Sequence, residues 1–270
     1  MTITLSAIHI YPVKSLGGIT LREAQCTRRG LQYDRRFLVV DEKGRFLTQR
    51  DFPKMATVWV DIEDDKLTLA APDLDAVEVA LQPDYANDCA PTCKAAVWSS
   101  IVNAHEVSAD ANRFLSDYLG THCKLVFMPD TSERLVNPEM AKNGEIVSFA
   151  DGYPFLLIAQ ESLVDLNSRM NKPLAMNRFR PNLVVKGCLP YAEDTWKQIR
   201  IGAASFRVVK PCIRCQITTT DQATGEVLGP EPLQTLAAYR NSPDGVMFGQ
   251  NLLPLRLGKI AIGDEIHIDV

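Results

Sequence analysis

The sequence predicts a mostly β fold with several helices, an α+β protein, from three observations. Most apolar runs are short, alternate with polar residues and are rich in Val, Ile and Thr. Turns containing Gly and Asp separate several of these runs, and three other segments have helical character. With 270 residues, 46% apolar and 23% charged, the chain is long enough for one large or two modest globular domains.

The first part of the chain is predicted to be mostly antiparallel β-structure. A turn over residues 41–44 joins two apolar runs, and Gly44 can adopt the positive φ that such a turn requires. The predicted strands are residues 6–11, 36–40 paired with 45–48, 57–62 paired with 66–69, and 77–81.

Three helices are predicted. The first covers residues 108–120, with Ser108 as a candidate N-cap and Gly120 at its end. The second covers residues 160–170, where three apolar side chains share one face. The third starts at residues 231–233, where a proline in the first turn needs no hydrogen-bond donor.

The last third of the chain returns to strands, and a loose segment interrupts the middle. Residues 83–93, rich in Pro, Asp and Asn, either link two subregions or form a surface loop within one domain. The predicted C-terminal strands are residues 198–201, 205–209, 259–262 and 265–268, and the last two are expected to form a hairpin through Gly263 and Asp264.

Charge and targeting signals exclude several classes of protein. A net charge of −4 argues against a general nucleic-acid binder, although it allows a local cationic pocket. The start of the chain lacks the features of a signal peptide, and no apolar run approaches the roughly 20 residues that span a bilayer. We therefore expect a cytoplasmic protein that binds neither nucleic acid nor membrane.

The number and spacing of the cysteines and histidines limit the kinds of metal site that the chain could form. Seven scattered cysteines do not indicate a disulfide framework, and the four histidines lack the spacing of zinc ligands. Cys215 follows Arg214, whose positive charge favours the thiolate, and a thiolate binds metals and attacks electrophiles. With Cys212 it forms a CxxC pair, which fills only half of a zinc site and precedes β-prone residues rather than a thioredoxin-like helix. Two structural thiols are the alternative interpretation.

Cationic residues are distributed along the chain in patterns that suit an anion. Lys14 and Ser15 follow the first strand beside two glycines, and together they could hold a phosphate, although a turn with a solvated lysine is the simpler interpretation. Arg178 and Arg180 are predicted to share one side of an extended segment, because the following proline disfavours helix at residue 180. Paired guanidiniums suit a multi-oxygen anion. The remaining candidates are Asn182, Arg35, Arg36 and Arg50.

Taken together, these segments resemble the MOSC superfamily, and within it the two-part members that reduce amidoximes and N-hydroxylated bases. The resemblance extends from Ile8 to Ile268. It implies an N-terminal β-barrel-like region at residues 1–120 packed on a C-terminal MOSC β-barrel domain at residues 121–270. The matching segments are YPVKS at 11–15, DR at 34–35, LVDLNSR at 163–169, RPN at 180–182, YAED at 191–194, RC at 214–215 and FGQ at 248–250.

The resemblance also implies a cofactor site. In that family a cysteine thiolate ligates molybdenum beside the dithiolene sulfurs of a pyranopterin, and the motif assigns this role to Cys215 and makes Cys212 a bystander. The cofactor is thus expected to be the molybdenum cofactor (Mo-molybdopterin), and pyridoxal phosphate is not expected. The residues implied to hold its pterin and phosphate are Lys14, Ser15, Arg35, Arg180 and Asn182, with Arg50, Asp151 and Arg214 in the same pocket.

The function that the resemblance implies is two-electron reduction of N-hydroxylated compounds: hydroxylamines, amidoximes or N-hydroxylated purines. The chain lacks a ferredoxin-type cysteine cluster, so electrons are expected from a separate flavin reductase, ferredoxin-like or cytochrome b5-like protein. Ile213 and Gly152-Tyr153 depart from the pattern of the amidoxime reducers, which leaves the shape of the substrate open. Two alternatives remain: a sulfur carrier for cofactor maturation that uses a cysteine persulfide, and a cofactor-binding module without turnover.

Overall fold

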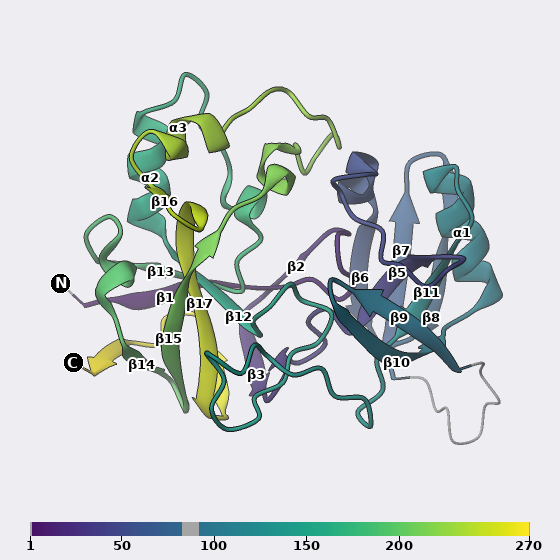
Figure 1. Cartoon of the computed structure of the whole chain (residues 1–270), viewed down its shortest axis with the longest axis horizontal. Helices are drawn as coiled ribbons and strands as arrows, with labels where there is room; N and C mark the ends of the chain where they lie inside the picture. The colour runs from purple at the N-terminus through teal and green to yellow at the C-terminus, as the bar shows by residue number, and fades with distance from the viewer. Residues whose placement is uncertain (1, 83–91, 270) are drawn as a thin grey trace.

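A nine-stranded sheet organises the larger half of the molecule, in the residues that the computed structural model describes, 2–82 and 92–269 (Figure 1). Its order is β19 (Ile266–Asp269), β14 (Gln198–Ile201), β15 (Ala204–Ile213), β17 (Gly245–Arg256), β12 (Phe155–Ala159), β13 (Leu183–Lys186), β1 (Thr4–Ile10) and β2 (Ile19–Leu21), with β16 (Asn241–Ser242) on β17. Neighbouring strands are antiparallel except β12 and β13. That parallel pair is joined by a crossover that contains α2 (Gln160–Ser168), as parallel pairing requires.

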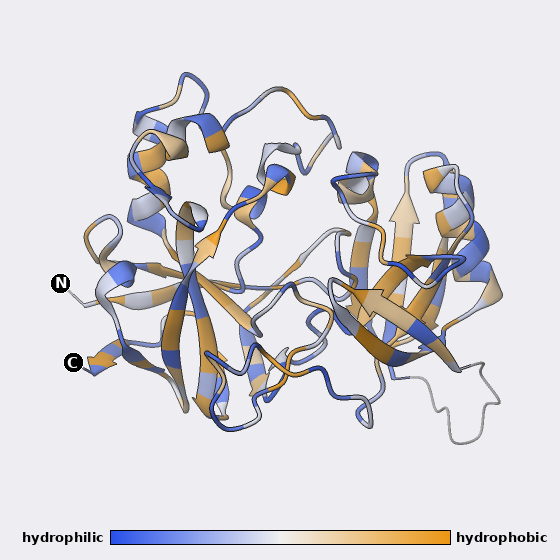
Figure 2. Ribbon diagram, viewed as in Figure 1, coloured by the Kyte–Doolittle hydropathy of each residue, from blue (hydrophilic) through white to orange (hydrophobic). Residues whose placement is uncertain are grey.

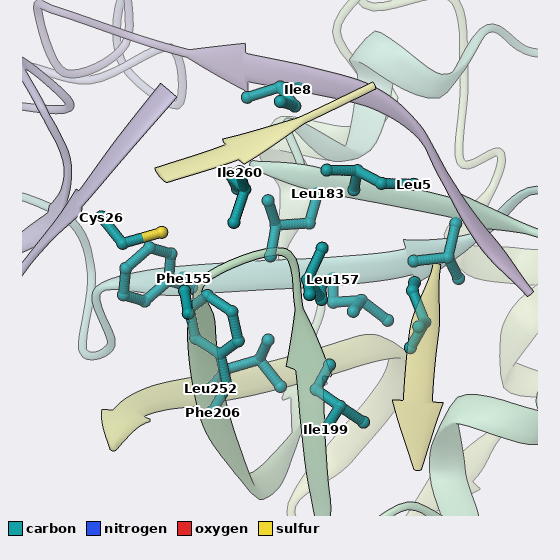
Figure 3. Close-up of a cluster of buried hydrophobic side chains, with 14 of the residues drawn as sticks. Leu5, Ile8, Cys26, Phe155, Leu157, Leu183, Ile199, Phe206, Leu252 and Ile260 are labelled. Carbon is teal, nitrogen blue, oxygen red and sulfur yellow. The ribbon is translucent and has the colours of Figure 1, made fainter. Parts of the chain in front are cut away.

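The buried face of this sheet forms a hydrophobic core. In β14, Ile199 and Ile201 are buried while Gln198 and Arg200 are exposed, which is the alternation expected of a strand. The rings of Phe155 and Phe206 meet edge to face with centroids 5.0 Å apart, and Figure 3 shows them side by side with Leu252. Because each such side chain contributes about 1.5–3 kcal/mol when fully buried, this core holds the strands in register.

A second group of strands forms the N-terminal barrel-like half. Helix α1 (Ala109–Leu119) covers it and has the predicted ends: the Ser108 hydroxyl accepts the N–H of Ala111 at 3.0 Å, and Gly120 is left-handed with φ 72°. Hydrophobic positions are frequent on the strands of both halves, and several strands also carry hydrophilic positions (Figure 2). The strands are β5 (Phe37–Asp41), β11 (Cys123–Phe127), β10 (Ser100–Glu106) and β9 (Thr92–Val97) in one sheet, and β6 (Trp59–Glu63), β7 (Lys66–Ala71) and β8 (Leu74–Ala80) in another.

Shorter elements complete the fold in the described residues. β18 (Lys259–Ala261), β3 (Glu23–Thr27) and β4 (Gly30–Leu31) form a small sheet, so a C-terminal strand pairs with an N-terminal one. β1 and β2 belong to the nine-stranded sheet, whereas β11 pairs with β5, so the chain passes between the halves more than once. The division at residue 120 therefore remains a proposal. The remaining helices are α3 (Leu233–Ala237) and the 3-10 turns η1 (Pro53–Thr57), η2 (Met176–Phe179), η3 (Ala192–Thr195) and η4 (Gln216–Thr219).

The predicted fold class is confirmed, as are the three helices and the pairing of residues 57–62 with 66–69 as β6 and β7. The hairpin predicted over 259–268 is wrong, because β18 pairs with β3 and β19 with β14. The intervening turn bonds instead to β1, through Gly263 N–H to Leu5 O at 2.8 Å. Of the loose segment 83–93, residues 83–91 lie outside the described residues.

Across the described residues, no helix combines the length and the apolar character needed to span a bilayer.

Candidate functional site

A cavity lies where loops from the two halves meet, and it gathers most of the predicted site residues. The cavity has a volume of about 130 Å³. The segments that form it are far apart in the sequence, so only the fold brings them together. The lining residues are Lys14, Ser15, Arg35, Ala150–Tyr153, Leu156, Arg178–Arg180, Asn182, Cys212–Cys215, Ile217, Thr218 and Asn251.

Both cysteines of the CxxC pair face this cavity. Cys215 is exposed and in extended conformation, and it immediately precedes η4. β15 shifts register against β17 between Pro211 and Ile213, and such a bulge redirects the side chains near it. As a result Cys212, three residues from Cys215, also lines the wall. Sequence spacing alone did not predict this second pocket thiol.

Arg214 contacts the sulfur of Cys212. Its Nη1 donates to Cys212 Sγ at 2.9 Å, and its Nη2 donates to the carbonyl of Phe179 at 2.5 Å, with the guanidinium over the Phe179 ring. The sequence predicted that Arg214 would act on Cys215. In the structure, its hydrogen bond to sulfur goes to the other thiol, because the bulge places Cys212 beside it.

Lys14 and Asp151 form the closest ion pair of the cavity. Lys14 Nζ donates to Asp151 Oδ1 at 2.6 Å, and the indole of Trp98 donates to the same oxygen at 3.2 Å. Burial lowers the pKa of Lys14, and Asp151 opposes that shift. Desolvation would raise the pKa of Asp151, but Lys14 outweighs it and holds that pKa below its usual range. Arg134 fixes the loop by donating to the carbonyl oxygen of Asp151 at 2.6 Å.

Arg35 and Arg180 approach one aromatic ring behind the cavity wall. Their guanidinium carbons lie 4.3 and 4.1 Å from the centroid of Tyr11. Arg35 is held further by Asp34, whose buried carboxylate accepts Nη1 at 2.7 Å, and its Nη2 reaches the carbonyl of Arg180 at 3.2 Å. The two guanidiniums are therefore fixed before any ligand binds.

Three site residues have left-handed backbone conformations: Ser15 with φ 71°, Arg35 with φ 49° and Arg180 with φ 53°. Non-glycine residues rarely adopt this region, and each instance costs of order 1–3 kcal/mol, so such residues concentrate at functional sites. The prediction of an extended segment for Arg178 and Arg180 is wrong. Tertiary contacts outweigh the local preference before Pro181, and Arg178 instead donates to Thr219 O at 3.0 Å.

The cavity contains more positive than negative charge. Lys14 pairs with Asp151, Arg35 with Asp34, and Arg178 with Asp221 at 2.8 Å. Within the described residues, two further lining cations form no ion pair, and each has one buried nitrogen without a hydrogen-bond partner. These cations are Arg180, through Nη2, and Arg214, through Nε.

An anion would satisfy this arrangement. Burial lowers the pKa of Arg180 to about 10, so its positive charge is held at a desolvation cost. A phosphate-bearing ligand with two negative charges would offset the charges of the two guanidiniums that form no ion pair among the described residues. The exposed thiol of Cys215 supplies a soft sulfur ligand in the same cavity. The residues present therefore fit a cofactor that combines a phosphate with a thiophilic metal.

The other predicted residues bond to or through backbone groups, or lie outside the cavity. The side chain of Asn182 ties β1 to β12, since Nδ2 donates to His9 O at 3.1 Å and Oδ1 accepts Leu156 N–H at 3.2 Å. The carbonyl of Ser15 accepts from Gln49 at 2.7 Å. Arg50 does not line the cavity; it stacks over Trp98 at 4.8 Å, one contact away from Asp151.

Several residues of the site were missed from the sequence. Tyr11, Asp34 and Arg134 support the lining residues from behind, and Gln49 binds Gln222 across the two halves at 2.9 Å. Asp34 directly precedes Arg35, and Tyr11 lies in the same matching segment as Lys14, so both carried a local signal. Arg134 had none, because its partners are backbone carbonyls that only the fold brings within reach.

Both halves of the chain match known domain families. Residues 2–122 match the MOSC N-terminal beta barrel domain, and residues 144–267 match the MOSC domain. The mouse (Mus musculus) mitochondrial amidoxime-reducing component 1 is 34% identical over 281 residues, covering 98% of this chain and 82% of the relative. The human (Homo sapiens) mitochondrial amidoxime reducing component 2 is 31% identical, covering 98% and 83%. A rice (Oryza sativa subsp. japonica) molybdenum cofactor sulfurase is 34% identical, covering 92% of this chain but only 32% of that protein.

Proposed function

Because the chain belongs to the MOSC family and contains both its N-terminal barrel and its MOSC domain, we propose that it is a molybdenum-cofactor-dependent reductase of N-hydroxylated compounds. Near full-length similarity to amidoxime-reducing components supports this activity over others in the family. The cytoplasmic location and the lack of nucleic-acid or membrane partners remain predictions.

One observation carries the proposal: an exposed thiol, Cys215, shares a cavity with the guanidiniums of Arg180 and Arg214, which form no ion pair in the part of the chain that the structure describes. A cofactor that presents a thiophilic metal at one end and a phosphate at the other needs both features in one place. When bound, the molybdenum cofactor supplies the two-electron redox chemistry, and the protein supplies binding, orientation and electrostatics.

The residues of the cavity have distinct roles in this proposal. Cys215 would hold the metal through its sulfur. Arg180 and Arg35, together with Arg214, would neutralise the phosphate, and the Lys14–Asp151 pair would hold part of the cavity wall. The side-chain amide of Asn182 would have a structural role, because it bonds to backbone groups of both β1 and β12 and so holds these strands in place.

The overall reaction converts R–NH–OH, two electrons and two protons into R–NH2 and water, with cleavage of the N–O bond. The electrons come from a separate donor protein, for which a flavin reductase, a ferredoxin-like protein or a cytochrome b5-like protein are the candidates. Hydroxylamines, amidoximes and N-hydroxylated purines are the proposed substrates.

A sulfur carrier for cofactor maturation is the second candidate function. The exposed position of Cys215 would suit a persulfide, and the similarity to a cofactor sulfurase covers most of this chain. Against it, the chain corresponds to only 32% of that sulfurase, whereas it covers 82% of the amidoxime-reducing component.

The test is to produce the protein in cells that make molybdenum cofactor, and to assay reduction of an N-hydroxylated base with a chemical electron donor. Turnover that depends on bound molybdenum is the expected result. A protein that carries molybdenum but reduces no N-hydroxylated compound would refute the reductase, and a stable persulfide on Cys215 that transfers sulfur would favour the carrier. Cys215→Ala should lose this turnover, and Cys93→Ala, which lies outside the cavity, is its matched control.

A further inference from the structure

We propose that Tyr11 is a positioning residue that holds Arg35 and Arg180 together as a preformed phosphate subsite. The inference rests on the proposed function for the identity of the natural ligand, but not for the geometry. Tyr11 is 3% exposed and does not line the cavity, so it acts through the two arginines.

Both arginines are connected to Tyr11 in two ways. Their guanidiniums lie 4.3 and 4.1 Å from its ring centroid. Their backbones are also tied to it: the N–H of Arg35 donates to Tyr11 O at 2.8 Å, and the Tyr11 hydroxyl donates to the carbonyl of Pro181, next to Arg180, at 3.2 Å. One residue therefore fixes the two arms of the subsite, which come from positions 145 residues apart.

Tyr11 is itself held firmly. Its N–H donates to Asp34 Oδ1 at 2.8 Å, the carboxylate that also binds Arg35. Its ring packs over Gly18, where an added Cβ would lie 2.5 Å from Cε1, so glycine is required for the close approach. The ring position is thus set by the fold rather than by the ligand.

The Tyr11 ring reduces the repulsion between the two guanidiniums when no anion is bound. Two guanidiniums in a poorly solvated wall repel each other, and only Arg35 has a carboxylate partner among the described residues. The negative faces of an aromatic ring attract cations and offset part of that repulsion without neutralising the charges. Burial raises the pKa of Tyr11 to about 12, so the hydroxyl stays protonated and continues to donate to Pro181. A phosphate then meets cations that are already in place.

The test measures binding of inorganic phosphate by isothermal titration calorimetry to protein produced without molybdenum cofactor. Three proteins are compared, with Tyr, Phe or 3,4,5-trifluorophenylalanine at position 11. The trifluorinated residue keeps the shape of the ring but removes the negative charge of its faces. The Phe variant is expected to bind within about threefold of wild type, since it loses only a neutral hydrogen bond to Pro181. The trifluoro variant is expected to bind about tenfold more weakly than the Phe variant, the loss for a desolvated cation–ring contact.

The same trifluoro replacement at Phe127 is the matched control, because Arg36 lies 5.0 Å from that ring and neither residue lines the cavity. It should leave phosphate affinity unchanged. Equal affinity of the Phe and trifluoro variants at residue 11 would overturn the inference, as would an equal loss from the Phe127 replacement. Failure of the proposed function is separate: a protein that shows the Tyr11 dependence but acquires no molybdenum would keep this inference and lose the reductase.

Discussion

Replacement of Asp34 by Asn should destabilise the protein strongly and in a way that phosphate partly reverses. The carboxylate of Asp34 is fully buried and accepts Arg35 Nη1 at 2.7 and 2.8 Å and the N–H of Tyr11 at 2.8 Å. Removing one partner of a buried pair leaves an uncompensated charge, which costs about 3–5 kcal/mol. For a chain of this length, that corresponds to a decrease in Tm of about 10 °C.

Thermal unfolding of wild type and Asp34→Asn, followed by circular dichroism with and without inorganic phosphate, measures the effect. Phosphate should raise the Tm of the variant more than that of wild type, because a bound anion would offset the freed charge of Arg35. Asp130→Asn is the matched control: Asp130 pairs with Arg36 but its side chain is 86% exposed, so its loss should cost at most about 1 kcal/mol. A loss below about 1 kcal/mol in Asp34→Asn would refute the reasoning that this buried carboxylate anchors the site.

Three further predictions concern other parts of the cavity. Since the folded pKa of Asp151 lies below its unfolded value of about 3.9, its charge contributes stability above that pH, which is lost as the pH falls through the folded value. Asp151→Asn should lower Tm at pH 7 and flatten the decline of Tm in acid, and a parallel decline in both proteins would contradict this. Gln222→Leu should cost about 1–3 kcal/mol in urea unfolding, because it leaves the buried amide of Gln49 with an unpaired oxygen. Ser15→Gly should stabilise the protein by about 0.5–1 kcal/mol by relieving a positive φ, and a destabilised glycine variant would show that the conformation is unstrained.

The parts of the fold that sequence predicted are those set by local chemistry. Ser108 and Gly120 bound α1 because a cap and a left-handed terminus act within a few residues. The pairing of β18 with β3 joins residues more than 230 positions apart, and no turn signal specifies such a partner. The predicted hairpin at Gly263 failed for this reason: a turn residue allows a reversal, but the pairing of β19 with β14 decides where the chain goes next.

In the candidate site, too, only some features could be predicted from the sequence. Lys14, Arg35, Arg180 and Cys215 were identified because each residue type suits an anion or a metal, and the resemblance connected them. The left-handed backbone of Arg180 could not be predicted, since the proline after it favours extended structure and only tertiary contacts override that preference. Their roles in binding cofactor remain predictions.

The central claim is that Cys215, and not Cys212, holds molybdenum, and X-ray absorption at the molybdenum edge tests it most directly. Protein from cells that make the cofactor should contain molybdenum with a thiolate among its sulfur neighbours. Cys215→Ala should lose molybdenum or retain it with fewer sulfur neighbours, while Cys212→Ala should match wild type. An unchanged sulfur shell in Cys215→Ala, or its loss in Cys212→Ala alone, would contradict the account.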